Sequence, residues 1–339
     1  MAFETGAKNL ITDVGGIAVG HADDHVMKSG TTAIIFEEPV TASCKVLGGA
    51  PGTRDTDLLA PHNVVEAIDA LVLSGGSAFG LAAAGGVQDW LLAQGRGYAV
   101  GPARVPIVPG AILFDLINGG DKSAVSNPLY HQLGRQAAEA AGTDFAIGSH
   151  GAGVGALTAD LKGGIGSAST YLSTHGITVG ALVAANPLGT VTIGKTNQFW
   201  AAPFELGDEF GGLGLPHPLP EDAQDLRIKF RDTDTPAQNA NTTIAVIATD
   251  AKLTKAKCQR LAIAAHDGFT RAIWPSHTPF DGDIVFAAAT GKVPVPDGID
   301  AMIDLGAAAG ATMARAIARG IYAATAADGD ILPVWSSLR

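Results

Sequence analysis

Short apolar runs and longer Ala-rich segments follow one another along the chain. The short runs end at Gly, Pro or Asn and are rich in β-branched residues, which is typical of buried strands. We expect strands at residues 32–36, 177–185, 242–249 and 284–289. The Ala-rich segments predict helices at residues 78–92, 133–141, 299–323 and from Thr254 up to Pro275. This alternation indicates an α/β protein, although the pattern alone does not choose among the α/β folds.

The helix that opens at Thr254 has the clearest helical periodicity. Its apolar residues recur at steps of three and four and form one face. They are Cys258, Leu261, Ala265, Phe269 and Ile273. Pro275 then stops the helix.

Residues 203–241 differ from the rest of the chain. They contain many Gly, Pro and acidic residues and show little periodicity. A loop of this length is uncommon inside a compact domain and is usually functional or flexible. Since we find no internal repeat and no linker, we expect residues 1–339 to form a single domain.

Composition supports a large, tightly layered core in this chain. Hydrophobic residues make up 47% of its 339 residues and charged residues 16%. The 44 glycines and the low aromatic content of 6% favour closely packed layers. The two cysteines, Cys44 and Cys258, are far apart and suggest neither a disulfide framework nor a cysteine zinc site.

Charge and hydropathy exclude several kinds of partner. The net charge is −11 and the 22 basic residues are scattered, so we do not expect nucleic acid to bind. The first residues lack the basic and apolar regions of a secretory signal, and no apolar stretch is long enough to span a membrane. A cytoplasmic location is therefore expected.

A Gly/Ser turn and the nine histidines are candidate binding sites. Ser74-Gly75-Gly76-Ser77 lies between a predicted strand and a helix, where either serine could cap the helix. Such a turn can cradle phosphate, but the Walker ending and the GxGxxG pattern are both absent, so close helix packing is favoured. His21 and His25 have no evident third metal ligand, and we interpret all the histidines as non-catalytic.

The junction between Asn241 and Thr242 allows two interpretations. Asn-Thr-Thr before a strand is most often the end of a loop. Alternatively, Thr242 could attack the carbonyl of Asn241, cut the chain and become an N-terminal residue. An N-terminal Thr can use its own α-amino group as the base for its hydroxyl, because that amine has a pKa of about 7.7–8.0.

The sequence around this junction resembles a known family. NTTIAVIATDA, which starts at Asn241, and HDGFTRAIWPSHTPFDGDIVFAAAT resemble the C-terminal subunit of self-cleaving N-terminal-nucleophile hydrolases. That family includes the L-aminopeptidase/D-amidase/esterase, the β-peptidyl aminopeptidases and the 6-aminohexanoate-oligomer (nylon-oligomer) hydrolase. Residues 11–21, 73–86, 151–166 and 178–189 resemble its earlier segments in the same order.

The resemblance implies a nucleophile and an acidic pair. The Asn241-Thr242 pair has the form found in the nylon-oligomer hydrolase, and Thr242 precedes Asp250 by the family's spacing of eight. Asp281 and Asp283 match the family's two carboxylates, which would hold the Thr242 ammonium and hydroxyl. Without the resemblance, Asp-Gly-Asp would be interpreted as a turn capped by its own side chains.

Two further residues match family positions, and one departs from them. Asn186 matches an Asn at a strand end whose amide would donate to the oxyanion, although an Asn-Pro turn is the plainer interpretation. Lys162 matches an active-site Lys in one alignment, and could otherwise be a surface Lys between strands. Phe114 stands where some members have Tyr, so it cannot supply a hydroxyl donor.

The resemblance also implies the architecture and the reaction. We expect a four-layer αββα sandwich and cleavage into an α fragment, residues 1–241, and a β fragment, residues 242–339. A tetramer of such heterodimers is implied, acting on short peptides or amide oligomers without metal or organic cofactor. Two alternatives stay open: an acyltransferase of the ornithine acetyltransferase type, and an uncleaved relative that is not an enzyme.

Overall fold

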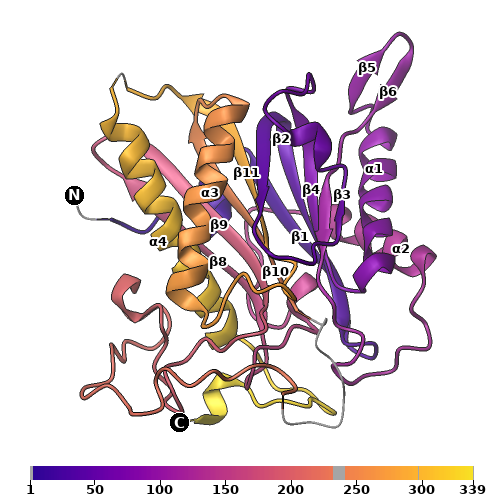
Figure 1. Ribbon diagram of the computed structural model, residues 1–339. Helices are drawn as coiled ribbons and strands as arrows, with labels where there is room; N and C mark the ends of the chain where they lie inside the picture. The colour runs from indigo at the N-terminus through magenta and orange to yellow at the C-terminus, as the bar shows by residue number, and fades with distance from the viewer. Residues whose placement is uncertain (1–2, 232–240, 297, 339) are drawn as a thin grey trace.

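The computed structural model describes residues 3–231, 241–296 and 298–338 (Figure 1). The described residues form four α-helices, α1 (Ala83–Ala93), α2 (Asn127–Glu139), α3 (Lys255–Ala272) and α4 (Asp300–Tyr322). The strands are β1 (Ile17–Asp24), β2 (Ser29–Val46), β3 (Thr53–Arg54), β4 (Ile68–Ser74), β5 (Tyr98–Val100), β6 (Ala103–Val105), β7 (Gly110–Ile112), β8 (Gly164–Leu172), β9 (Ile177–Asn186), β10 (Thr242–Ala251) and β11 (Ile284–Val293).

Strand β2 joins two layers of strands. Its first part pairs with β1 and β4, and its later part pairs with β11. The strand order is β3-β7-β4-β2-β11-β10-β9-β8, with β1 beside β2. Helices α3 and α4 cover one side and α1 and α2 cover the other (Figure 1).

Three separate apolar cores confirm the predicted four-layer αββα arrangement. One core lies between α3, α4 and strands β8–β11, and includes Phe269 and Met313. The second lies between the two layers of strands, and the third joins α1 and α2 to the β2–β4 layer. Each layer therefore buries apolar side chains against its neighbour, which is what holds the sandwich together.

Strand β10 is buried on both faces, because it lies in an inner layer. Ala245 and Ile247 pack on the helix side, whereas Ile244 and Val246 pack between the strand layers. Side chains alternate along a strand, so Thr242 lies on the face shared by Ile244 and Val246. This is why the segment has a nearly continuous apolar sequence rather than an alternating one.

The structure corrects some element boundaries. Helix α2 begins at Asn127, six residues before the predicted start, with a proline in its first turn. The predicted 78–92 helix begins as a 3-10 helix, Ser77–Ala82, and neither serine caps it. The Ser74 hydroxyl instead pairs with the hydroxyl of Thr31 at 2.8 Å. Thr254 caps α3 through its side chain. Cys44 and Cys258 are both free.

The Gly/Ser turn binds a carboxylate of its own chain. The N–H of Gly76 donates to Asp115 Oδ1 at 2.8 Å, and Gly76 has a φ of 83°, which favours glycine. This contact agrees with the packing interpretation of the turn. Among the described residues, no helix has the length and apolar character that crossing a membrane requires.

Candidate active site

The junction between Asn241 and Thr242 lies at the buried start of β10. Asn241 is 1% exposed and Thr242 is 5% exposed. The Thr242 hydroxyl donates a short hydrogen bond to the carbonyl oxygen of Asn241. The N–H of Gly282 donates to the same oxygen at 3.1 Å. A hydroxyl and a backbone donor therefore converge on one peptide carbonyl.

Strand register brings Asn186 opposite Thr242. The two residues are direct partners in the antiparallel pairing of β9 and β10. Leu182 and Ala184 of β9 lie in the core between the strand layers, so Asn186 projects to that side too. The structure thus places Thr242 and Asn186 on one face, and confirms that Asn186 ends its strand.

Gly282 lies too close to Thr242 to carry a side chain. A Cβ atom at Gly282 would lie 2.7 Å from Thr242 Oγ1 and 2.7 Å from the carbonyl oxygen of Ala50. Gly282 therefore allows the loop between Asp281 and Asp283 to contact the junction. Asn241 also forms a parallel bridge with Asp281, which fixes the two segments side by side.

The two carboxylates of the Asp-Gly-Asp segment are buried and bound by other segments. Asp281 is 0% exposed and Asp283 is 1% exposed. Asp283 accepts from the N–H of Thr243 at 2.8 Å, and Asp281 accepts from the N–H of Leu188 at 3.1 Å. Both carboxylates therefore bind backbone groups of the β9 and β10 segments near the junction, rather than only capping their own turn.

Lys229 supplies a buried amine beside this group. Its Nζ donates to Asn186 Oδ1 at 3.0 Å and to the Asn186 carbonyl at 3.3 Å. Burial lowers the pKa of Lys229 to about 7, against a smaller opposing attraction from Asp281. Burial raises the pKa of Asp281, and the neighbouring Asp283 raises it further. The amine thus changes protonation near neutral pH, in contact with the residue opposite Thr242.

Lys162, the lysine that the resemblance implies for the site, is bound near the C-terminal end of the chain. Its ammonium binds Asp330 at 2.8 Å and the carbonyl of Thr325 at 3.0 Å. Lys28 also binds Asp330, so the carboxylate links two buried lysines near the C-terminal end. The lysine that contacts Asn186 is Lys229, which comes from the irregular segment before the junction.

Asn186 makes contacts that fix the orientation of its amide. Its Oδ1 accepts from the N–H of Leu157 at 2.9 Å as well as from Lys229. Its Nδ2 donates to the carbonyl of Phe114 at 3.1 Å. Phe114 therefore contributes through its backbone, although its side chain lacks the hydroxyl of the family tyrosine.

A cavity of about 10 Å³ adjoins Asn186 and Lys229. Asp115 and Asn118 also line it, and each has a buried side-chain oxygen with no hydrogen-bond partner among the described residues. A polar cavity of this size has room for about one water molecule.

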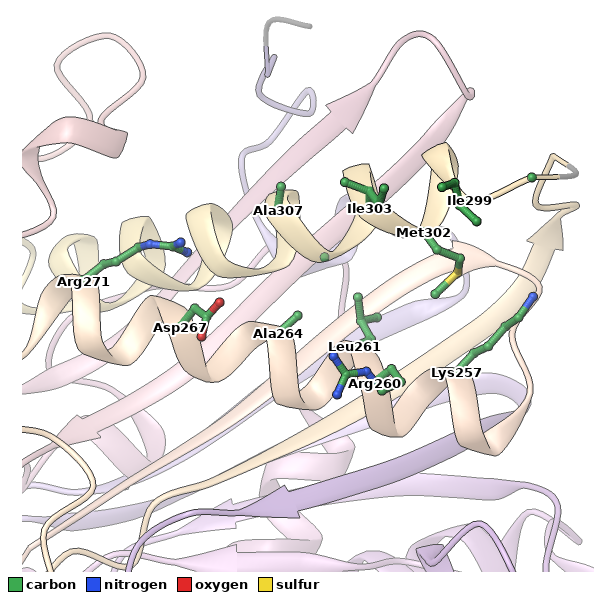
Figure 2. A pocket seen from close by; sticks show the side chains of 12 residues that line it. Lys257, Arg260, Leu261, Ala264, Asp267, Arg271, Ile299, Met302, Ile303 and Ala307 are labelled. Atoms are coloured by element: carbon green, nitrogen blue, oxygen red, sulfur yellow. The ribbon is translucent and has the colours of Figure 1, made fainter.

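A much larger groove lies elsewhere, between α3 and α4. Its volume is about 560 Å³, and it is lined by apolar residues such as Leu261 and Ile303. Figure 2 shows Lys257 and Arg271 at its opposite ends. None of the predicted site residues lines this groove.

Two parts of the site were not found from the sequence. His277, interpreted as non-catalytic, donates through Nδ1 to Asp283 at 2.8 Å. The one sequence feature that could have indicated His277 is its position six residues before Asp283. Lys229 offered no comparable signal, because it lies in a segment without periodicity and contacts Asn186 43 residues earlier.

Comparison with known proteins agrees with this architecture. The structure matches a β-aminopeptidase from Burkholderia with a TM-score of 0.71 and 24% identity, covering 100% of this chain and 94% of that one. It matches the L-aminopeptidase D-Ala-esterase/amidase of Ochrobactrum anthropi with a TM-score of 0.67 and 22% identity, covering 96% and 88%. The latter is described as a variant of the Ntn hydrolase fold, so this chain has that fold.

Sequence comparison gives the family. The model of Peptidase family S58 matches residues 9–331, and the chain belongs to this family of hydrolases. An uncharacterized aminopeptidase of Mycobacterium tuberculosis is 44% identical over 95% of this chain and 96% of its own length. A 6-aminohexanoate-oligomer endohydrolase of Kocuria is 29% identical over 86% of this chain and 78% of its own length. The predicted family resemblance is thereby confirmed.

Proposed function

We propose that this protein is an amide hydrolase that cuts itself between Asn241 and Thr242 and then uses Thr242 as an N-terminal nucleophile. The observation that carries the proposal is the pair of contacts on the Asn241 carbonyl. The Thr242 hydroxyl and the Gly282 N–H both meet that oxygen. A nucleophile and an oxyanion donor at one carbonyl are the two requirements of acyl transfer.

Self-cleavage begins with attack of Thr242 Oγ1 on the carbonyl carbon of Asn241. The Gly282 N–H stabilises the oxyanion, the C–N bond breaks, and the acyl group moves to the hydroxyl oxygen as an ester. Water then hydrolyses the ester, which leaves the Asn241 carboxylate and a free Thr242 amine. Lys229 takes the hydroxyl proton, directly or through one water, and returns it to the Thr242 nitrogen as the C–N bond breaks. A separate base is needed because the α-amine is still an amide at this stage.

The mature enzyme uses the new α-amine as its base. Thr242 attacks a substrate amide, the amine product leaves, and water releases the acid from the acyl-enzyme. Asn186 donates to the oxyanion of the substrate, and Asp281 and Asp283 hold the Thr242 ammonium. Residues 1–241 and 242–339 stay associated, because β10 pairs with β9 and β11 in the core.

The relatives support linear amides as substrates. One is named as an aminopeptidase and another as a 6-aminohexanoate-oligomer endohydrolase. We therefore propose short peptides or ω-amino-acid oligomers for this chain. A panel of an L-aminoacyl amide, a β-peptide and a 6-aminohexanoate oligomer, assayed with and without an amino-acid acceptor, tests this proposal. Acid release without an acceptor is expected, whereas turnover only with an acceptor would establish acyl transfer instead.

Replacement of Gly282 by Ala is expected to block self-cleavage. The added Cβ would lie 2.7 Å from Thr242 Oγ1, so either the hydroxyl or the Gly282 N–H must move away from the Asn241 carbonyl. Loss of one oxyanion donor alone costs roughly 10²–10³-fold in rate. Intact-mass spectra would show one chain. Gly306→Ala is the control, since a Cβ atom at Gly306, in α4, would meet only the Cβ of Ala264, at 3.6 Å. Normal cutting of Gly282→Ala would contradict the assigned role.

Self-cleavage should become faster as the pH rises through about 7. Burial lowers the pKa of Lys229 to about 7, so below that pH the amine is protonated and cannot accept a proton. Above it, Lys229 is neutral and competent as a base. The appearance of residues 242–339, followed by mass spectrometry at several pH values, measures this dependence. A rate that does not change across neutral pH would argue against Lys229 as the proton acceptor.

A further inference from the structure

Two consecutive residues, His277 and Thr278, each hold one of the two carboxylates. His277 donates its N–H and its Nδ1 to the same oxygen of Asp283, at 3.1 and 2.8 Å. Thr278 donates its N–H and its hydroxyl to one oxygen of Asp281, at 3.0 and 2.6 Å. A backbone donor and a side-chain donor from a single residue therefore fix each carboxylate.

The remaining carboxylate oxygens extend these contacts to the junction. Asp283 accepts from the Thr243 N–H, so it holds the residue that follows Thr242. Asp281 accepts from the Leu188 N–H, just beyond the end of β9. Gly282, between the two carboxylates, donates to the carbonyl of Asn241. The Gly282 N–H thus lies between two residues whose carboxylates are both anchored.

His277 is held in an uncommon conformation. Its φ is 54°, a value that few residues other than glycine adopt. Its ring stacks on Phe269 at 5.3 Å between centroids, and the His266 ring meets its edge at 4.8 Å. Such a backbone persists where the surrounding contacts over-determine it, and it is common at functional sites.

We propose that His277 and Thr278 are positioning residues, which orient Asp283 and Asp281 for self-cleavage and for hydrolysis. This inference rests on the proposed function. The carboxylates act on Thr242, and these two residues act through the carboxylates. A displacement of about 1 Å at a reacting group can cost 10²-fold in rate, so loss of one side-chain donor should slow the reaction without unfolding the protein.

Paired substitutions test the proposal. Thr278→Val removes the hydroxyl and keeps the shape, whereas Thr278→Ser keeps the hydroxyl. His277→Leu removes the donor, whereas His277→Asn keeps an N–H donor and tolerates positive φ. Self-cleavage would be followed by intact mass after cell-free synthesis, and kcat and KM would be measured on a 6-aminohexanoate oligomer.

We expect Thr278→Val and His277→Leu to cut themselves about 10²-fold more slowly and to lose kcat at little-changed KM. Thr278→Ser and His277→Asn should recover most of the rate. Thr312→Val and His150→Leu are controls, because they remove a buried Thr–Thr hydrogen bond and a His–Asp pair that involve none of the junction residues.

Wild-type rates in Thr278→Val and His277→Leu would overturn the proposal. So would equal slowing in the conservative variants at an unchanged melting temperature, since that result would not depend on the donors. Failure of the proposed function has a different signature, because the wild-type chain itself would then stay uncut.

Discussion

Replacement of Thr242 by Val is expected to leave one uncut, inactive chain of 339 residues. Valine keeps the branched shape at the start of β10 but has no oxygen to attack the Asn241 carbonyl. Loss of a nucleophile costs on the order of 10⁶-fold in turnover in hydrolases that act through an acyl-enzyme. Denaturing intact-mass spectra and an amide-hydrolysis assay would measure both consequences.

Thr243→Val is the matched control for this substitution. Thr243 is fully buried, and its hydroxyl has no hydrogen-bond partner among the described residues. Because side chains alternate along β10, its hydroxyl lies on the face opposite to Thr242 and Asn186. Thr243→Val should therefore cut itself normally. Cutting in Thr242→Val but not in Thr243→Val would move the nucleophile by one residue and contradict the assignment.

Replacement of Lys229 by Met is expected to slow self-cleavage by about 10²–10⁴-fold, the usual contribution of a general base. Folding should not suffer. In the unfolded chain Lys229 stays protonated up to its ordinary pKa of 10.5, whereas burial lowers the folded value to about 7. Burial of this amine therefore opposes folding below pH 10.5, and most strongly below pH 7. Lys229→Met should then raise the melting temperature most at low pH.

The Lys162→Met variant distinguishes the role of Lys162 from that of Lys229. Lys162 and Lys229 are each 4% exposed, but the Lys162 ammonium binds Asp330 and the Thr325 carbonyl. Its loss should lower the free energy of unfolding by about 1–3 kcal/mol, the usual cost of removing a buried hydrogen-bonding partner. Self-cleavage should continue. Thermal denaturation and mass spectrometry on both variants would measure the contrast, and an uncut Lys162→Met protein would support a role for Lys162 in the site.

The strand and helix pattern predicts the layers because each layer must bury a defined face. The run at residues 242–249 is apolar at almost every position, and β10 is indeed buried on both sides. The helix that begins at Thr254 shows one apolar face, and α3 packs that face on the strands. Local sequence is less decisive at the Gly/Ser turn. The Ser74 hydroxyl could have capped a helix, but it forms a hydrogen bond with Thr31, which is distant in sequence.

The site is predictable where residues lie in strands and less so where loops supply the partners. Thr242 and Asn186 lie at the ends of strands that the sequence predicts, but their roles were inferred from the family resemblance, and only the structure gives the register that pairs them. Lys229 comes from a segment with no periodic pattern, so the sequence contains no indication of which strand end it contacts. The tetramer of heterodimers and the cytoplasmic location stay predictions.

The most direct test of the account is a denaturing intact-mass spectrum of the purified wild-type protein. We predict two species that match residues 1–241 and residues 242–339, with a summed mass that exceeds the uncut chain by one water. A single species of 339 residues that persists after long incubation at a pH above 7 would contradict self-cleavage at Asn241, and with it the assignment of Thr242 as the nucleophile.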